Sequence, residues 1–208
     1  MEFNLIDIDK WNRKEYFNHF YKDIPCTYSL TAKLDITNIK NKNLKLYPAL
    51  IYCITLTVNK YKEFRTAYNS KGQLGYYNKM IPCYTVFNKE SELFYNLWTN
   101  MQDNINDFIT AYNDDILTYG SKNMMNPKPN MPENTFPISM IPWVSFEGFN
   151  LNLQKGYDYL LPIFTAGKYS IENEKYIMPL ALQVHHGVCD GYHTGRFINT
   201  LQEIIDNI

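Results

Sequence analysis

The sequence predicts an α/β protein of the α+β two-layer sandwich type, with a mixed β-sheet and helices packed mainly on one face. Segments with the period of a helix and segments that alternate like strands are interleaved along the 208 residues, without a strict β-α repeat. A hydrophobic fraction of 45% and a charged fraction of 20% are typical of globular chains and exclude a disordered one.

The first elements are predicted to be a helix, a strand and a second helix. Asp9 is expected to cap a helix that extends to about Tyr21, where apolar residues share one side. Segment 27–36 alternates in the manner of a strand. Tyr47-Pro48 opens the second helix, because proline suits the first helical position.

A short strand is predicted at 83–87, and the long segment 91–119 is predicted to be helical. Its apolar residues recur at the spacing of one helix face: Leu93, Leu97, Met101, Ile105, Phe108 and Ile109. The proline-rich run 127–132 is interpreted as a loop. Because this loop is too short to separate two domains, we expect a single domain over residues 1–208.

The last part of the chain is predicted to be rich in strands and to end in a helix. The predicted strands are 138–141, 144–153, 160–168 and 175–185. The closing helix covers 191–208, and its inner side carries Phe197, Leu201, Ile204 and Ile208. Helices and strands therefore mix along the chain as the fold class requires.

Composition excludes several classes of function. The net charge is −1 and no basic block occurs, so neither nucleic acid nor an anionic membrane is expected as a partner. The mixed, acidic N-terminus does not resemble a secretory signal, and the longest apolar run, 47–58, is too short to span a bilayer. Cys26, Cys53, Cys83 and Cys189 lack C-x-x-C spacing, which indicates free thiols in a reducing cytosol. We therefore expect a cytoplasmic protein.

Three of the four histidines lie within nine residues, at His185, His186 and His193. If the preceding strand keeps its period of two, His186 shares an apolar face with Val184, and His185 points the opposite way. Partial burial keeps an imidazole neutral, as a general base must be near pH 7. His186 is therefore the candidate base.

Other interpretations of this segment remain open from the residues alone. A histidine at a strand end is often structural, and Asp190 can simply cap the helix that follows it. Cys189 could act as a nucleophile paired with a histidine. A metal site is not favoured, because His185 and His186 point to opposite faces of the strand and no second ligand cluster occurs.

The segment His185-His186-x-x-x-Asp190-Gly191 resembles the signature of the CoA-dependent acyltransferases. Further segments resemble the chloramphenicol acetyltransferase family, in the family's order and at its spacing. They include Trp11-Asn12-Arg13-Lys14-Glu15, Pro25-Cys26-Thr27-Tyr28-Ser29, Pro142-Trp143-Val144-Ser145-Phe146 and Pro162-Ile163-Phe164-Thr165. The resemblance covers essentially the whole chain, and it favours catalysis over a structural role for the histidines.

The resemblance implies a role for each of five residues. His186 matches the base that deprotonates the 3-hydroxyl of chloramphenicol, and the alkoxide then attacks acetyl-CoA directly in a ternary complex. Ser139 matches the hydroxyl that hydrogen-bonds the tetrahedral oxyanion, and Thr165 a threonine that holds a water there. Asp190 matches a structural carboxylate paired with an arginine, here Arg13.

The resemblance also implies the binding residues and the assembly. The positions that match the chloramphenicol pocket are Phe20, Ile24, Phe94, Phe149, Leu153 and Ile163. Tyr169 matches an aromatic residue that contacts CoA. Gly187 and Tyr192 depart from the family, which usually has alanine and phenylalanine there, without removing a group that the mechanism needs. Acetyl-CoA is the implied co-substrate, with no permanently bound cofactor and no metal, and a homotrimer with active sites between subunits is implied.

Two other functions compete with this one. Apolar pocket residues discriminate weakly, so the acceptor could be another small hydroxylated molecule. A non-catalytic trimer that sequesters the drug is the alternative from another class. It is disfavoured, because sequestration needs none of His186, Ser139, Asp190 and Arg13, which are all present.

Overall fold

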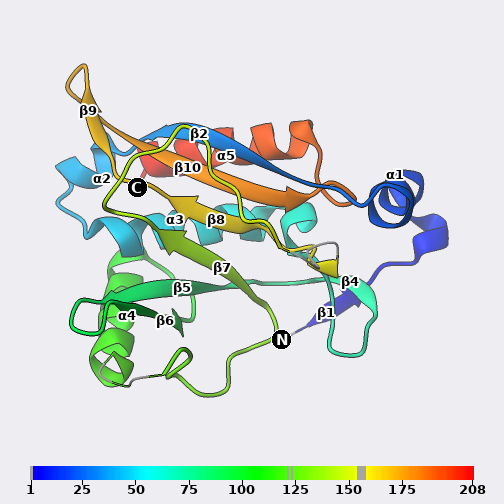
Figure 1. The fold of residues 1–208 in the computed structure, drawn as a ribbon, viewed down its shortest axis with the longest axis horizontal. Coiled ribbons are helices and arrows are strands. Elements are labelled where there is room, and N and C mark those ends of the chain that lie inside the picture. The colour runs from blue at the N-terminus through cyan, green and yellow to red at the C-terminus, as the bar shows by residue number, and fades with distance from the viewer. Residues whose placement is uncertain (1, 121, 123, 154–157) are drawn as a thin grey trace.

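The computed structural model describes residues 2–120, 122, 124–153 and 158–208, and a mixed β-sheet forms its centre (Figure 1). In the described part of the chain this sheet has the order β2-β10-β8-β7-β5-β6, with β9 paired to β10. Its strands are β2 (Thr27–Asp35), β5 (Ile81–Asn88), β6 (Leu93–Trp98), β7 (Thr135–Met140), β8 (Ile163–Ala166), β9 (Ser170–Glu172) and β10 (Lys175–His185). β7 runs parallel to β5 and β8, and the other pairs are antiparallel.

Three long helices lie on one side of this sheet (Figure 1). They are α3 (Leu46–Lys60), α4 (Ile105–Tyr119) and α5 (Gly191–Asp206). α3 is apolar on nearly all sides and lies between the other two helices, where it forms the centre of the core. α5 is amphipathic and buries Phe197, Leu201 and Ile205. The predicted fold class, a mixed sheet with helices mainly on one face, is confirmed.

The second half of the chain follows the sequence pattern closely. β10 has the predicted bounds, and α5 begins at the predicted residue and ends two residues early. β7 and β8 lie within or beside the predicted strands. The segment 144–153 differs: it is irregular and crosses the sheet face opposite the helices (Figure 1). The Gln183 side chain on β10 holds it there by accepting from Leu151 N at 2.8 Å and donating to Leu151 O at 3.0 Å.

The predicted helix from Asp9 to Tyr21 is replaced by three short turns of different types. These are the 3₁₀ turn η1 (Ile8–Lys10), α1 (Lys14–Asn18) and the π-helical η2 (His19–Asp23). Asp7, rather than Asp9, caps the first of them, since its carboxylate accepts a hydrogen bond from Asp9 N. Phe17 is the buried anchor of α1.

The prediction of one helix over 91–119 is wrong in its first half. β6 pairs with β5 as a hairpin, and only then does α4 begin, at Ile105 after the Asn104 cap. Leu93 and Leu97 satisfy a helical spacing, but Tyr95 and Leu97 are the buried pair, as in a strand. Pairing with the preceding strand, β5, therefore decided the conformation.

A small second sheet, which the sequence did not predict, packs beside the first helices. Its order is β1-β4-β3, formed by β1 (Phe3–Leu5), β3 (Thr66–Tyr68) and β4 (Leu74–Tyr77). The helical segments α2 (Thr37–Asn41) and η3 (Lys62–Arg65) flank α3. The buried Arg65 donates to the carbonyls of Tyr77 and Asn78, which ties η3 to this sheet.

Two sequence-based expectations concern the chain as a whole. Of the helices in the described ranges, none is at once long and apolar enough to cross a membrane. The single domain over residues 1–208 stays a prediction.

The core between α5 and the sheet is expected to depend on Phe197. Its fully buried ring contacts Phe64 at 4.6 Å and Phe164 at 5.3 Å between centroids. Phe197→Ala should lower the free energy of unfolding by about 3–5 kcal/mol in urea denaturation, because a cavity remains. The control Leu117→Ala, at an 80% exposed position, should change it by less than about 0.5 kcal/mol. Equal losses in the two variants would contradict this account of the core.

Candidate active site

His186 lies immediately after the end of β10 and is held by aromatic rings. Its backbone N–H donates to Cys26 O at 2.9 Å, which continues the pairing of β10 with β2 by one residue. Its imidazole stacks on Phe20, with ring centroids 3.8 Å apart and an interplanar angle of 10°. Tyr28 meets the same imidazole edge-on, with centroids 5.3 Å apart. These rings fix the plane of a half-buried side chain.

The contacts of the His186 ring also fix which nitrogen carries the proton. Nδ1 lies 3.2 Å from Cys189 O. A carbonyl oxygen only accepts hydrogen bonds, so Nδ1 of the neutral ring bears the hydrogen. The lone pair is then on Nε2, which is the nitrogen left to accept a proton from another molecule. This is the tautomer that a general base needs.

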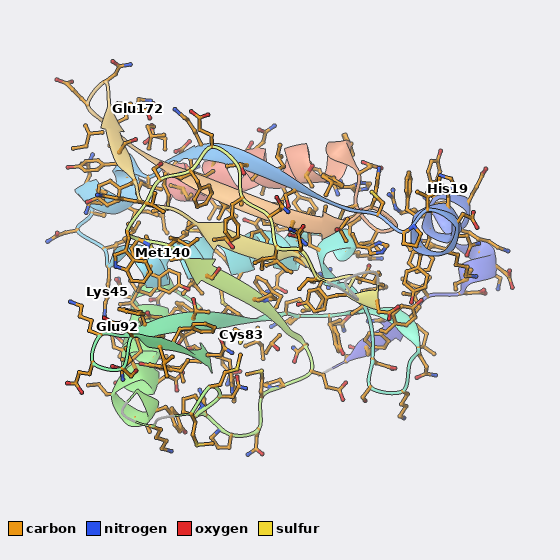
Figure 2. All side chains as sticks on the ribbon, in the orientation of Figure 1. His19, Lys45, Cys83, Glu92, Met140 and Glu172 are labelled. Atoms are coloured by element: carbon orange, nitrogen blue, oxygen red, sulfur yellow. The ribbon has the colours of Figure 1, made fainter. Side chains whose placement is uncertain are left out.

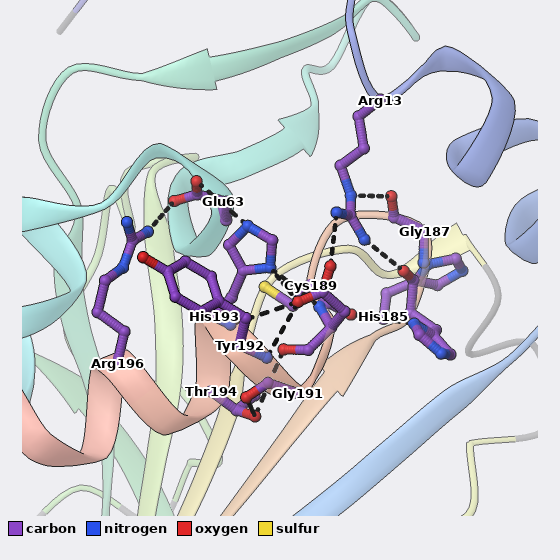
Figure 3. A network of polar contacts seen from close by, with 12 residues as sticks. Arg13, Glu63, His185, Gly187, Cys189, Gly191, Tyr192, His193, Thr194 and Arg196 are labelled. Carbon is purple, nitrogen blue, oxygen red and sulfur yellow. Dashed lines mark hydrogen bonds and ion pairs between the residues drawn. The ribbon is translucent and has the colours of Figure 1, made fainter.

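Arg13 clamps the turn that carries His186 (Figure 3). Its Nε donates to Gly187 O at 2.9 Å, its Nη2 to His186 O at 3.1 Å and its Nη1 to Asp190 Oδ2 at 3.0 Å. The Arg13 side chain is only 13% exposed. Three N–H groups of one planar guanidinium therefore hold two backbone carbonyls at the start of the turn and the Asp190 carboxylate at its end.

Asp190 is both a helix cap and the partner of Arg13. Its Oδ1 accepts from Tyr192 N and His193 N at the start of α5, and its Oδ2 accepts from Arg13. Burial acts to raise the pKa of this carboxyl, but the hydrogen bond from Arg13 and the neighbouring His193 outweigh it, so the pKa is lowered. A carboxyl with a lower pKa in the folded state stabilises the fold at neutral pH. That contribution is lost as the pH falls through the lowered pKa.

The residues beside His186 have structural contacts. His185 is buried, and its Nδ1 accepts a hydrogen bond from Gly187 N at 3.0 Å. Cys189 is fully buried, and this burial raises the pKa of its thiol. A thiol that stays protonated is a poor nucleophile, so the structure disfavours covalent catalysis at Cys189.

Ser139 and Thr165 form a second polar pair, on neighbouring strands. They are register partners on β7 and β8, and their hydroxyl oxygens are 3.0 Å apart. Thr165 is buried, whereas Ser139 is only partly covered and lies in the wall of a groove. A hydroxyl in this position can donate to a group that enters the groove.

The groove has a volume of about 840 Å³ and a mainly apolar lining. It contains three of the predicted pocket residues, Phe94, Leu153 and Ile163. Figure 2 marks three further residues of its lining, Cys83, Glu92 and Met140. The sequence analysis missed the aromatic walls formed by Tyr47, Tyr112, Trp143 and Tyr159. No pattern distinguished these rings from ordinary core residues.

The remaining predicted residues lie in three places. Phe149 belongs to the loop that crosses the sheet and lines a small cavity together with Ile163 and Thr165. Phe20 and Ile24 belong to the N-terminal segment beside His186, and Ile24 is exposed. Tyr169 follows β8 and contacts the ring of Tyr176, with the ammonium of Lys40 5.1 Å from its ring centroid.

Within this chain the His186 turn and the Ser139–Thr165 pair are far apart. Thr165 pairs with Ala181 on β10, and His186 is five residues further along. At about 3.4 Å per residue this separation is about 17 Å. Figure 2 shows His19, the neighbour of Phe20, at the opposite end of the molecule from Met140, which follows Ser139. One chain therefore does not assemble both clusters into one site.

The site offers two hydroxyls and an imidazole. Over the ranges that the structure describes, no three His, Cys, Asp or Glu side chains are grouped as a metal site would require. All four cysteines are free. The chemistry that the described residues support is proton transfer by His186 and hydrogen bonding by Ser139.

Solved structures share this fold over nearly the whole chain. A chloramphenicol acetyltransferase superposes with a TM-score of 0.83 and 21% identity, covering 98% of this chain and all of that one. A probable dihydrolipoamide acetyltransferase from Listeria monocytogenes superposes with a TM-score of 0.64 and 10% identity, covering 100% and 95% of the two chains. The fold is therefore that of these acetyltransferases.

Sequence comparison narrows this class to one family. The family model described as chloramphenicol acetyltransferase matches residues 1–202. A chloramphenicol acetyltransferase of Vibrio anguillarum is 55% identical over 100% of this chain and 96% of its own length. One of Clostridium perfringens is 56% identical over the full length of both. The chain belongs to the chloramphenicol acetyltransferase family.

Cys189→Ala is expected to leave the chemistry intact. Turnover should stay within about threefold of wild type, since the buried sulfur takes no part in group transfer. Initial-rate kinetics against both substrates should show converging lines, as for a ternary complex. Cys53→Ala, at a buried cysteine in α3, is the matched control. Parallel lines, or an acetylated Cys189 found by mass spectrometry, would refute direct transfer.

Proposed function

We propose that this protein transfers the acetyl group of acetyl-CoA to the 3-hydroxyl of chloramphenicol and so inactivates the antibiotic. The observation that carries the proposal is the His186 turn. Its Nδ1 faces a carbonyl, its Nε2 is left to accept a proton, and Arg13 holds the backbone carbonyls of His186 and Gly187. Membership of the chloramphenicol acetyltransferase family supports the choice of acceptor.

The proposed reaction begins with the proton of the acceptor hydroxyl. His186 Nε2 removes it while the oxygen attacks the thioester carbonyl, which becomes a tetrahedral oxyanion. The Ser139 hydroxyl donates a hydrogen bond to this oxyanion, and Thr165 holds a water beside it. Such a donor contributes about 10²–10³-fold in rate when it is aimed at the developing charge. Collapse of the intermediate expels the CoA sulfur, which takes the proton back from His186 and leaves the acetyl ester.

The separation of the two clusters supports active sites between subunits, and the family resemblance supports a homotrimer. His186, with Phe20 and Ile24, would come from one subunit, and the groove that contains Ser139 from its neighbour. The groove is exposed in the single chain, and apolar residues such as Phe94 and Leu153 lie open on its wall. Closed symmetric assembly would cover them and complete each site.

The two substrates would then approach from different sides. Chloramphenicol, a small aromatic molecule, would occupy the apolar groove between His186 and Ser139. Tyr169 lies beyond β8, on the far side of Ser139 and Thr165 from His186, and would contact CoA. Acetyl-CoA is present in the cytoplasm, and we infer that the protein acts there.

His186→Ala tests the base. Turnover should fall by about 10²–10⁴-fold, the range that proton transfer supplies, while binding of CoA persists. His185→Ala is the matched control, and it should retain far more turnover because the buried His185 ring accepts a hydrogen bond from Gly187 N and takes no part in the proposed proton transfer. CoA release from acetyl-CoA, measured with and without chloramphenicol, reports both variants. A larger loss of turnover in His185→Ala than in His186→Ala would contradict the assignment of His186 as the base. If CoA were released with another hydroxylated acceptor but not with chloramphenicol, the proposed acceptor would be wrong.

Arg13→Val and Asp190→Asn test the clamp. Asparagine caps a helix as well as aspartate does, so a pure cap would tolerate Asp190→Asn. We expect each variant to lose most of its turnover, because a partly buried charge is left without its partner and the His186 turn shifts. The double variant should be far from additive in turnover and in melting temperature. If Asp190→Asn kept full activity, Asp190 would act only as a helix cap and the clamp would be contradicted.

A further inference from the structure

His193 is the third histidine of the cluster, and the proposed reaction gives it no role. It lies in the first turn of α5, where its side chain is 14% exposed and lies between two carboxylates (Figure 3). Its Nδ1 is 2.7 Å from Asp190 Oδ1, and its Nε2 is 3.6 Å from Glu63 Oε1. A nearly buried imidazole between two acidic groups on different elements is an arrangement that needs an explanation.

The Nδ1 atom has two possible partners, and only one of them is compatible with the shorter contact. Asp190 Oδ1 lies at 2.7 Å and Asp190 N at 3.2 Å. The pKa of Asp190 is lowered, because Arg13 and His193 outweigh the effect of burial, so this carboxyl is ionised and only accepts hydrogen bonds. Nδ1 therefore carries a hydrogen and donates it to Oδ1. With that hydrogen in place, the 3.2 Å contact between the backbone N of Asp190 and Nδ1 is the weaker of the two.

On its other side the ring faces Glu63, which has its own partner. Glu63 Oε2 accepts from Arg196 Nη2 at 3.3 Å, and the Arg196 guanidinium lies 4.2 Å above the ring of Tyr61. The result is a chain of five side chains, Arg13, Asp190, His193, Glu63 and Arg196. It joins the N-terminal segment, the His186 turn, α5 and η3.

We propose that His193 is a positioning residue of the acetyl transfer, acting through Asp190 on the His186 turn. Arg13 holds one oxygen of the Asp190 carboxylate and His193 holds the other, so the carboxylate cannot rotate. On the opposite side the Glu63 carboxylate lies 3.6 Å from Nε2, close enough to act on the imidazole by its charge. The inference rests on the proposed function, because it concerns the geometry of the base in that reaction.

His193 is placed to affect turnover without touching either substrate. It lines a separate cavity of about 650 Å³, together with Trp11, Arg13, Tyr16, Glu63 and Asp190. None of its lining residues belongs to the groove that contains Ser139. Loss of His193 should therefore lower kcat and leave the KM values of both substrates unchanged. The cavity is also large enough to admit a free imidazole molecule.

Steady-state kinetics of His193→Ala, with and without added imidazole, tests the proposal. We expect kcat about 10–100-fold below wild type, the cost of a slightly misplaced base, and both KM values within about twofold. Imidazole should restore a large part of kcat by filling the vacated space, and should leave wild-type turnover unchanged. Glu63→Gln should also lower kcat, but by a smaller factor than His193→Ala does. The matched control Glu172→Gln, which removes the charge from a surface ion pair with Lys33, should leave kcat unchanged.

A measurement of the ¹⁵N shifts of the His193 ring tests the contact without any assay. The wild-type spectrum should show hydrogen on Nδ1, bonded to Asp190. The proposal would be overturned if Nδ1 carried no hydrogen, or if His193→Ala and Glu63→Gln both kept the wild-type kcat. It would also be overturned if imidazole did not restore the kcat that His193→Ala loses. If His193→Ala does not fold, the kcat of Glu63→Gln and the ¹⁵N shifts of the wild-type ring still test the proposal. Wild-type protein that releases no CoA with chloramphenicol would refute the proposed function instead.

Discussion

The register between β8 and β10 sets the distance on which the rest of the site depends. Because Thr165 pairs with Ala181, the hydroxyls on β7 and β8 are displaced by about 17 Å along the strand direction from the histidine after β10. Strand pairing on both sides of β10 prevents any local movement from closing this gap. The proposed reaction would therefore need a second copy of the chain, which would close the site at the apolar groove beside Ser139.

Because this distance is fixed, the turn after β10 must hold the His186 side chain in a precise position. A turn is intrinsically more mobile than a strand, yet in the proposed reaction His186 would present Nε2 to an incoming hydroxyl. Arg13 supplies the rigidity by bonding to two carbonyls and one carboxylate of the turn, from 173 residues or more away in sequence. The ring of Phe20 comes from the same N-terminal segment, so one short stretch orients both the backbone and the imidazole.

The sequence predicted the fold class and most elements of the second half, because strands such as β10 have long apolar runs ended by glycine. It failed at Leu93–Trp98, where residues four apart resemble a helix face although β5 pairs with them. It also failed at 144–153, whose apolar Val144 and Leu151 remain exposed. Residue pattern does not distinguish a core face from one that a ligand or a subunit covers. The Arg13–Asp190 contact came from family resemblance, and Glu63 carried no sequence signal.

Subunit complementation tests the central claim, that His186 and Ser139 of one active site come from different chains. His186→Ala and Ser139→Ala proteins, each nearly inactive, would be unfolded together, refolded as a mixture and assayed for chloramphenicol-dependent CoA release. In randomly mixed trimers about a quarter of the interfaces pair an intact His186 with an intact Ser139, so about a quarter of wild-type activity should return. A mixture that stays as inactive as its two components would contradict the account.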